Sequence, residues 1–165
     1  RNIAIVSSFK NGKVLVMEYA DEKSMYKYIT TKGDILPESW YRFDFNNGEV
    51  INYYLDARPF SEGYAAVEYK KGRWCYIDAS DDVPQRFGDY DSAKPFSEGL
   101  APVRHSNKWG FVNSKFELVI PYKYDYCTLF HNGLAGFVIA GNSLSIYGYI
   151  NKSGEVIWQN ELVNE

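Results

Sequence analysis

The chain has 165 residues, enough for one ordinary domain with a sizeable hydrophobic core. Apolar residues make up 45% and aromatic residues 18%, a composition that excludes disorder and favours β-structure. The net charge is −3 without clusters of Lys or Arg, so we expect no nucleic-acid partner. We also expect no membrane insertion, because no apolar run approaches the ~18 to 20 residues of a membrane span.

Two short phrases recur along the chain. The first reads Pro-Phe-Ser-Glu-Gly-Tyr-Ala-Ala-Val at 59–67, Pro-Phe-Ser-Glu-Gly-Leu-Ala-Pro-Val at 95–103 and, less completely, Phe-His-Asn-Gly-Leu-Ala-Gly-Phe-Val at 130–138. The second reads Trp-Gly-Phe-Val-Asn at 109–113, with related forms at 26–30, 74–78 and 147–151. A period of roughly 35 residues indicates a tandem repeat protein, in which each repeat buries its apolar face against its neighbours.

The phrases divide a single domain, residues 1–165, into four repeats at about 9–58, 59–94, 95–129 and 130–160. Each repeat is predicted to be an antiparallel meander of about three strands; in the third repeat these are 100–104, 109–113 and 117–120. A turn follows the second phrase at Gly33, Asp81, Phe116 and Gly154. The first repeat is longer, and its segment 39–56 predicts an added hairpin around Asn46-Asn47-Gly48-Glu49.

Glycines recur at one phase of the repeat, at positions 12, 63, 99 and 133. They predict either a backbone with positive φ or a backbone approached too closely for a side chain. A Tyr-Asp pair closes the repeat, at Tyr90-Asp91 and Tyr124-Asp125, five residues before the next Phe.

Together the phrases resemble the WG (KWG) containing repeat family over nearly the whole chain, from about Phe9 to Trp158. The third repeat is the closest match, whereas the first departs most, with Tyr26-Lys27 in place of Trp-Gly. The resemblance implies a bacterial tandem β-repeat protein without a well-assigned activity. The chain begins at Arg1 rather than Met, so we leave its compartment undetermined, cytoplasmic or exported, and treat it as a possible fragment.

The predicted fold is all-β, with about four antiparallel meanders arranged as an open curved stack; the alternative is a closed, small propeller-like ring. Trp74 and Trp109 are expected to pack on the next meander rather than to face a ligand. Cys75 and Cys127 are interpreted as buried free thiols in preference to a disulfide, because they occupy different phases of the repeat.

The sequence offers little catalytic chemistry. His105 and His131 have no neighbouring triad or metal-site spacing, so we expect no enzyme activity, no metal and no cofactor. Asp89 and Asp91 flank Tyr90 and are the best carboxylate pair for a hydrolase, but Asp91 belongs to the repeated Tyr-Asp pair. A residue present in several copies is more often structural than catalytic.

We expect the binding surface in the part of the chain that departs from the repeat. There the candidate binding residues are Trp40, Tyr41, Arg42, Tyr53 and Tyr54. Aromatic faces edged by hydrogen-bonding groups suit protein hot spots and sugar stacking, although the same residues also suit a hairpin that buries one aromatic face. We therefore expect a non-enzymatic scaffold for protein–protein interaction, with glycan or cell-wall binding as the alternative and carboxylate-based hydrolysis as a third reading.

Overall fold

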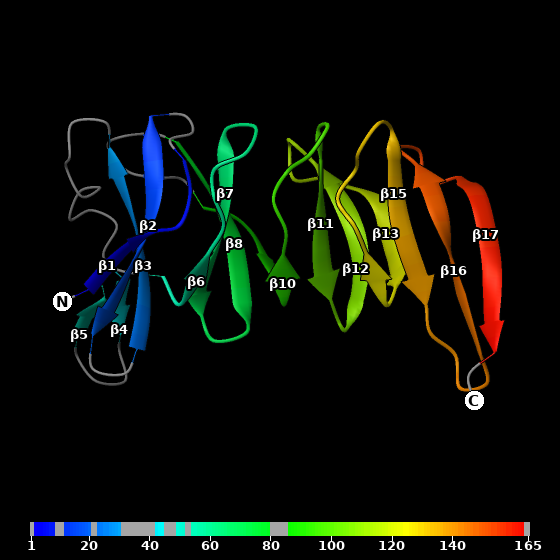
Figure 1. Cartoon of the computed structure of the whole chain (residues 1–165), viewed down its shortest axis with the longest axis horizontal. Coiled ribbons are helices and arrows are strands. Elements are labelled where there is room, and N and C mark those ends of the chain that lie inside the picture. The colour runs from blue at the N-terminus through cyan, green and yellow to red at the C-terminus, as the bar shows by residue number, and fades with distance from the viewer. Residues whose placement is uncertain are drawn as a thin grey trace. The chain divides into compact units, whose positions relative to one another are not determined.

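The computed structural model describes residues 2–8, 12–20, 23–30, 42–44, 49–51, 54–79 and 86–163. In these stretches all regular structure is β-strand (Figure 1). The chain divides into two compact units, an N-terminal unit of Arg1–Asp89 and a C-terminal unit of Tyr90–Glu165. No helix in the described stretches has the length and apolar character needed to cross a membrane.

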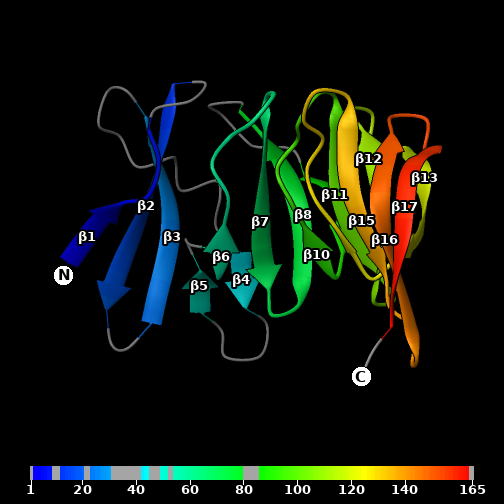
Figure 2. The same cartoon turned by 45° about the vertical axis from the view of Figure 1, so that its right-hand side comes forward.

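The N-terminal unit contains sheet 1 and sheet 2. Sheet 1 has the order β1-β2-β3, with β1 (Asn2–Ile5), β2 (Lys13–Ala20) and β3 (Lys23–Thr30). Sheet 2 has the order β6-β7-β8-β9, with β6 (Asp56–Ala57), β7 (Tyr64–Lys70), β8 (Arg73–Asp78) and β9 (Arg86–Tyr90). Strands β3 and β6 are neighbours, so the two sheets pack together (Figure 2).

A short hairpin lies in the segment where the sequence predicts one. Its strands are β4 (Arg42–Asp44) and β5 (Glu49–Ile51), which pair antiparallel with Asp44 opposite Glu49. The predicted turn residues 46–48 lie outside the described residues.

The C-terminal unit contains sheet 3 and sheet 4, each an antiparallel meander. Sheet 3 comprises β10 (Ser92–Ala93), β11 (Leu100–His105), β12 (Lys108–Asn113) and β13 (Leu118–Tyr124). Sheet 4 comprises β14 (Tyr126–Cys127), β15 (Leu134–Ile139), β16 (Leu144–Asn151) and β17 (Val156–Val163). The first strand of each sheet has only two residues, too few to show alternation, and for this reason the sequence predicted three strands instead of four.

The all-β fold class with tandem meanders is confirmed. Each sheet of the described residues has two edge strands, and none closes into a barrel. Within a unit the two sheets therefore form an open stack, held by side chains of facing sheets.

The glycine of the first phrase is required by a tight hairpin turn. Glu98 and Gly99 have φ of 55° and 84°, and reciprocal backbone hydrogen bonds of 2.9 and 3.2 Å join Ser97 to Leu100. Two consecutive positive φ values define a type I′ turn, which favours glycine at its second central position. A Cβ added at Gly99 would meet no atom within 4 Å, so the requirement is positive φ and not close approach.

The asparagine that ends the second phrase organises the next turn. Asn113 Oδ1 accepts hydrogen bonds from the backbone N–H groups of Lys115 and Glu117, at 2.9 and 3.1 Å. Asn151 makes the equivalent bonds in the fourth repeat. The predicted turn positions Phe116 and Gly154 follow with φ of 62° and 82°, whereas Gly33 and Asp81 lie outside the described residues.

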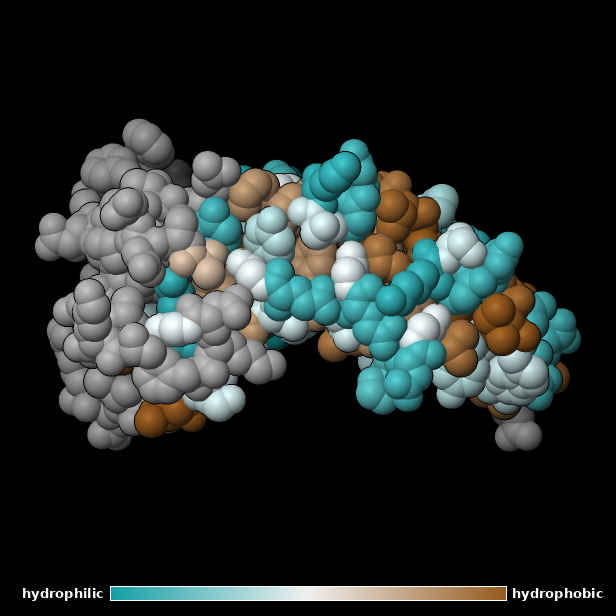
Figure 3. Space-filling view, turned by 90° about the horizontal axis from the view of Figure 1, so that it is seen from above, coloured by the Kyte–Doolittle hydropathy of each residue, from teal (hydrophilic) through white to brown (hydrophobic). Residues whose placement is uncertain are grey.

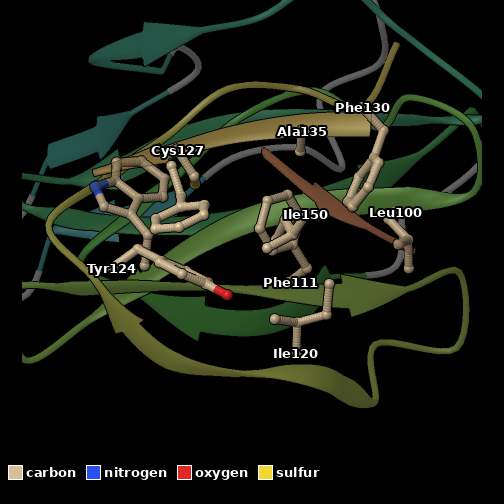
Figure 4. Packing of buried hydrophobic residues seen from close by; sticks show 10 residues of the cluster. Leu100, Phe111, Ile120, Tyr124, Cys127, Phe130, Ala135 and Ile150 are labelled. Carbon is tan, nitrogen blue, oxygen red and sulfur yellow. The ribbon is translucent and has the colours of Figure 1, made fainter. Parts of the chain in front are cut away.

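The core of the C-terminal unit lies between sheets 3 and 4 (Figure 4). Phe111 and Phe130 form its centre, with ring centroids 5.0 Å apart in an edge-on contact. The surrounding buried residues come from both sheets: Leu100, Trp109, Ile120 and Tyr124 from sheet 3, and Cys127, Ala135, Phe137 and Ile150 from β14–β16 of sheet 4. Trp109 is buried here, as the sequence predicts.

Hydrogen bonds also connect the segment between β10 and β11 of sheet 3 to sheet 4. Ser97 Oγ donates to the carbonyl of Phe130 at 2.7 Å, and Glu98 Oε2 accepts from the Gly133 N–H at 2.9 Å. Lys94 Nζ donates to the carbonyl of Cys127 at 2.5 Å. The repeated Ser-Glu pair therefore connects one repeat to the next, and the Gly133 N–H holds the pKa of the Glu98 carboxyl below its usual range.

A smaller core fills the N-terminal unit. Tyr28 and Phe60 pack with ring centroids 4.9 Å apart, and Tyr28 Oη donates to the carbonyl of Arg58 at 2.7 Å. Burial raises the pKa of Tyr28 well above its ordinary value. Trp74 is also buried, and the Arg58 guanidinium lies 5.0 Å from its ring centroid.

The Tyr-Asp pair marks the corner at which the chain leaves one sheet and enters the next. Tyr124 ends β13 with a buried ring, and Asp125 stands between β13 and β14. The two oxygens of Asp125 accept from Lys108 Nζ at 2.6 Å and from the Ala140 N–H at 2.8 Å. These contacts hold the pKa of Asp125 below its ordinary value of 3.8.

Replacing Asp125 with asparagine is expected to lower the free energy of unfolding at pH 7 by about 1 kcal/mol. Because the folded-state pKa is lowered, the carboxylate stabilises the fold at pH values above 3.8, and this contribution is lost as the pH falls through the lowered pKa. The difference between wild type and Asp125→Asn should therefore shrink on acidification, as measured by urea unfolding at a series of pH values. A difference that stays constant down to about pH 2 would contradict this origin.

Both cysteines are buried free thiols, as the sequence predicts. Burial raises the pKa of Cys75 to about 11 and that of Cys127 to about 12. Each fills the space of a small apolar residue in its core, and Cys127 stands where the preceding repeats have Ala57 and Ala93.

We expect both thiols to react with a disulfide reagent at pH 8 at least about a hundredfold more slowly in the folded chain than after unfolding in guanidinium. The raised pKa values leave little thiolate at that pH, and burial limits access further. Absorbance at the wavelength of the released thiol measures the rate. Rapid stoichiometric labelling of the folded chain would contradict the assignment.

Candidate functional site

Sheet 4 has one face packed on sheet 3 and one face open to solvent, here called the outer face. Ile150 points to sheet 3 and is buried, so its neighbour Tyr149 points the other way, because side chains alternate along a strand. Tyr147 shares the outer face with Tyr149, and Trp158 lies opposite Tyr149 on the adjacent strand. Exposed hydrophobic side chains are visible in the C-terminal unit, on the right-hand side of Figure 3.

These side chains form an aromatic groove of about 390 Å³, a size typical of small-ligand sites. Trp158 is at its centre, with ring centroids 5.8 Å from Tyr147 and 6.2 Å from Tyr149. The other lining residues are Tyr126, Thr128, Gly136, Phe137, Val138 and Gly148. The groove is therefore mainly apolar.

Lys94 holds one side of the aromatic groove in place. Its Nζ lies 4.1 Å from the ring centroid of Tyr126 and 4.8 Å from that of Trp109. A cation over an aromatic face is attracted by the ring quadrupole, so Lys94 fixes the Tyr126 ring while its own Nζ is also bonded to the Cys127 carbonyl.

The outer face of sheet 4 repeats the face by which sheet 3 contacts sheet 4. In the second phrase, Tyr147 and Tyr149 of sheet 4 occupy the positions that Trp109 and Phe111 occupy in sheet 3. On the adjacent strands, Ile120 pairs with Phe111 and Trp158 pairs with Tyr149, so Ile120 and Trp158 are also equivalent. The first phrase matches Leu100 with Leu134. The four sheet 3 residues are 0–8% exposed, whereas their sheet 4 counterparts are 37–49% exposed. The outer face is thus a repeat-stacking surface that is uncovered in the described structure.

Of the five binding residues predicted from the sequence, the structure describes the side chain of Tyr54 alone. Trp40, Tyr41 and Tyr53 lie outside the described residues, and only the backbone of Arg42 is described, in β4 opposite Ile51. Tyr54 belongs to the N-terminal core: its ring is 7% exposed, it contacts Tyr28, and burial raises its pKa.

Sequence reasoning missed the outer face because Tyr147, Tyr149 and Trp158 occupy ordinary repeat positions. The sequence carries no signal that separates them from their counterparts in sheet 3, because the equivalent residues Trp109, Phe111 and Ile120 are core.

The candidate carboxylates have structural partners. Asp89 accepts hydrogen bonds from Tyr69 Oη at 2.9 Å and from the Arg73 guanidinium. Asp91 accepts from the Ser106 N–H at 2.7 Å, the same corner contact that Asp125 makes with Ala140. Within the described stretches no group of three or more His, Cys, Asp or Glu side chains is placed to hold a metal ion.

The fold and the repeated contacts define a tandem β-meander repeat protein. The chain belongs to the WG containing repeat family, whose model matches residues 46–74, 88–109 and 109–142, just over half of the sequence. Among curated proteins, none matches the chain.

Proposed function

We propose that this protein is a non-enzymatic β-repeat scaffold that binds a protein partner through the outer face of sheet 4. The observation that carries the proposal is the exposure of Leu134, Tyr147, Tyr149 and Trp158 at positions that are core in sheet 3. Burial of such apolar area contributes about 25 cal/mol per Å², and aromatic side chains are enriched among binding hot spots.

The partner that fits is a protein surface with apolar, partly small side chains. The template is the side of sheet 4 that covers sheet 3, which presents Cys127, Ala135 and Phe137 beside Phe130. Small side chains there leave room for the larger rings opposite. A partner surface of this kind would fill the groove between Tyr147, Tyr149 and Trp158 and remove their rings from water.

Affinity capture with the full chain, followed by calorimetric titration of each purified candidate, tests this proposal. The double variant Tyr149→Ala/Trp158→Ala should weaken binding at least tenfold, because both residues are large, exposed and central to the groove. Leu118→Ala is the matched control, since Leu118 is an exposed apolar residue of sheet 3. Unchanged affinity in the double variant would reject the outer face as the site.

The segment 39–56, with Trp40, Tyr41, Arg42 and Tyr53, is kept as a proposed second contact, without the buried Tyr54. The variant Trp40→Ala/Tyr41→Ala belongs in the same titrations. A tenfold loss there with no loss in the outer-face variant would move the proposed site to the hairpin.

Glycan or cell-wall binding is the second candidate function, favoured by the half-exposed tryptophan between two tyrosines. Trp158 is 48% exposed, whereas Trp74 and Trp109 are at most 7% exposed. Of these three tryptophans, Trp158 is therefore the one whose fluorescence should change when a soluble polysaccharide binds in the groove. Binding there should alter the emission of the wild type and leave that of Trp158→Phe unchanged. A flat response of the wild type across a polysaccharide panel would remove this candidate.

A further inference from the structure

Strand β17 is a long edge strand with an accessible backbone. It comprises eight residues, Val156–Val163, and pairs along one side with β16, while sheet 4 ends at its other side. Every side chain of β17 is exposed. An edge of this length offers a row of backbone N–H and C=O groups to another strand.

The equivalent edge of sheet 3 carries two features that oppose strand pairing, and β17 has lost both. Strand β13 contains Pro121, which has no N–H, and Lys123. The position of β17 that matches Pro121, counted from Ile120 and Trp158, is Gln159. Beyond Pro121 the register of the β12–β13 pair is irregular, so Lys123 has no single counterpart, but β17 contains neither proline nor lysine. Proline and lysine are the residues with which proteins most often protect an edge. With Glu161 as its one charged residue, β17 is chemically suited to accept a further strand.

We propose that β17 pairs antiparallel with β17 of a second copy across a twofold axis, so that two copies of sheet 4 form one continuous eight-stranded sheet in a homodimer. A second copy is the occupant because an edge strand pairs antiparallel with itself around a twofold axis, which makes the contact self-complementary. This contact uses the edge of sheet 4 and leaves its outer face free, so it is independent of the proposed function.

The alternation of side chains restricts the register of the pair. Paired residues of two antiparallel strands lie on the same face of the sheet, and the even-numbered residues of β17, such as Trp158, lie on the outer face. The outer faces of the two copies therefore form one face of the eight-stranded sheet only if even-numbered residues pair with even-numbered residues. An axis through Gln159 satisfies this condition and places Ile157 opposite Glu161. It also keeps the two Glu161 side chains from lying directly opposite each other, a like-charge arrangement that would destabilise the pair.

Gln159→Pro is the variant that separates edge pairing from folding. Pro121 occupies the matching position of β13, beside an irregular stretch of the β12–β13 pair, so this position of the meander accepts proline in an edge strand. Glu161→Lys, which places a lysine in the edge strand, is the second variant. Trp158→Ala is the control because it removes a side chain of the outer face and no backbone group of the edge.

The mass of the full chain in solution tests the proposal, by light scattering and sedimentation over a range of concentrations. We expect the wild type and Trp158→Ala to reach about twice the monomer mass of 19.0 kDa, and both edge variants to have a dimer dissociation constant at least tenfold higher. Circular dichroism and thermal unfolding establish that each variant is folded. Amide hydrogen exchange of 156–163 should slow as the wild-type concentration rises.

A wild type that stays monomeric at a few hundred micromolar would overturn the proposal, as would a dimer that Gln159→Pro leaves intact and Trp158→Ala dissociates. The latter result would assign self-association to the outer face. Binding of a partner by the Gln159→Pro monomer would support the proposed function separately, so the two proposals fail independently.

Discussion

Replacing Phe130 with alanine is expected to lower the free energy of unfolding by about 3–5 kcal/mol. The Phe130 ring is 1% exposed, lies edge-on against Phe111 and belongs to the cluster that joins sheets 3 and 4. Alanine would remove this buried area and leave a cavity that two hydrogen-bonded sheets can close only in part. Because a repeat protein is stabilised mainly through contacts between neighbours, the loss weakens the whole C-terminal unit.

Urea unfolding monitored by far-ultraviolet circular dichroism measures this loss. Tyr149→Ala is the matched control: it truncates an aromatic ring of the same sheet, but on the outer face, where the ring is 49% exposed. We expect it to cost about 1 kcal/mol or less. Equal losses in the two variants would show that the contact between sheets 3 and 4 is not the main source of stability.

Replacing Gly110 with alanine should have the next largest effect, a loss of about 2–3 kcal/mol. A Cβ at this position would lie 2.5 Å from the carbonyl oxygen of Ile120 and 3.0 Å from the backbone nitrogen of Tyr122. Neither neighbour is a flexible side-chain end, so β12 and β13 would have to separate and move Ile120 within the core. The glycine of the Trp-Gly phrase is thus required by close approach of the next strand.

Gly99→Ala is the informative comparison, because Gly99 has positive φ but open space around its missing side chain. Its cost should be about 1–2 kcal/mol, from backbone strain alone. Thermal and urea unfolding of both variants measure the difference. If Gly110→Ala costs no more than Gly99→Ala, close approach of β13 is not the reason for a glycine at this position.

Local features of the fold could be predicted from the sequence because they depend on short stretches of chain. The glycine phase predicted either positive φ or close approach at Gly99, where the structure has positive φ in a type I′ turn, and the spacing of the second phrase predicted the turns at Phe116 and Gly154. The repeat also predicted burial of Trp109 and of both cysteine thiols. The choice between positive φ and close approach at a given glycine needed the positions of neighbouring strands.

The candidate site depended on features that a repeat pattern does not contain. Tyr149 and Phe111 hold the same position in their repeats, yet one is half exposed and the other is fully buried. Periodicity places both on the same face of a meander; whether another sheet covers that face is decided by tertiary packing. Tyr54 shows the converse: it was predicted as a binding residue, but it holds the same place before Phe60 as Tyr124 does before Phe130 and is likewise part of a core.

The amino-acid sequence by itself determined the β-meander, its turns and the faces that its apolar residues share, since these follow from backbone preferences and side-chain alternation within some 35 residues. Only the tertiary structure decided that sheets 3 and 4 bury one stacking face and leave the next one open. The physical reason is that a side chain on the face of a sheet is buried only when a second surface packs against that face. A single repeat specifies only one of these two surfaces.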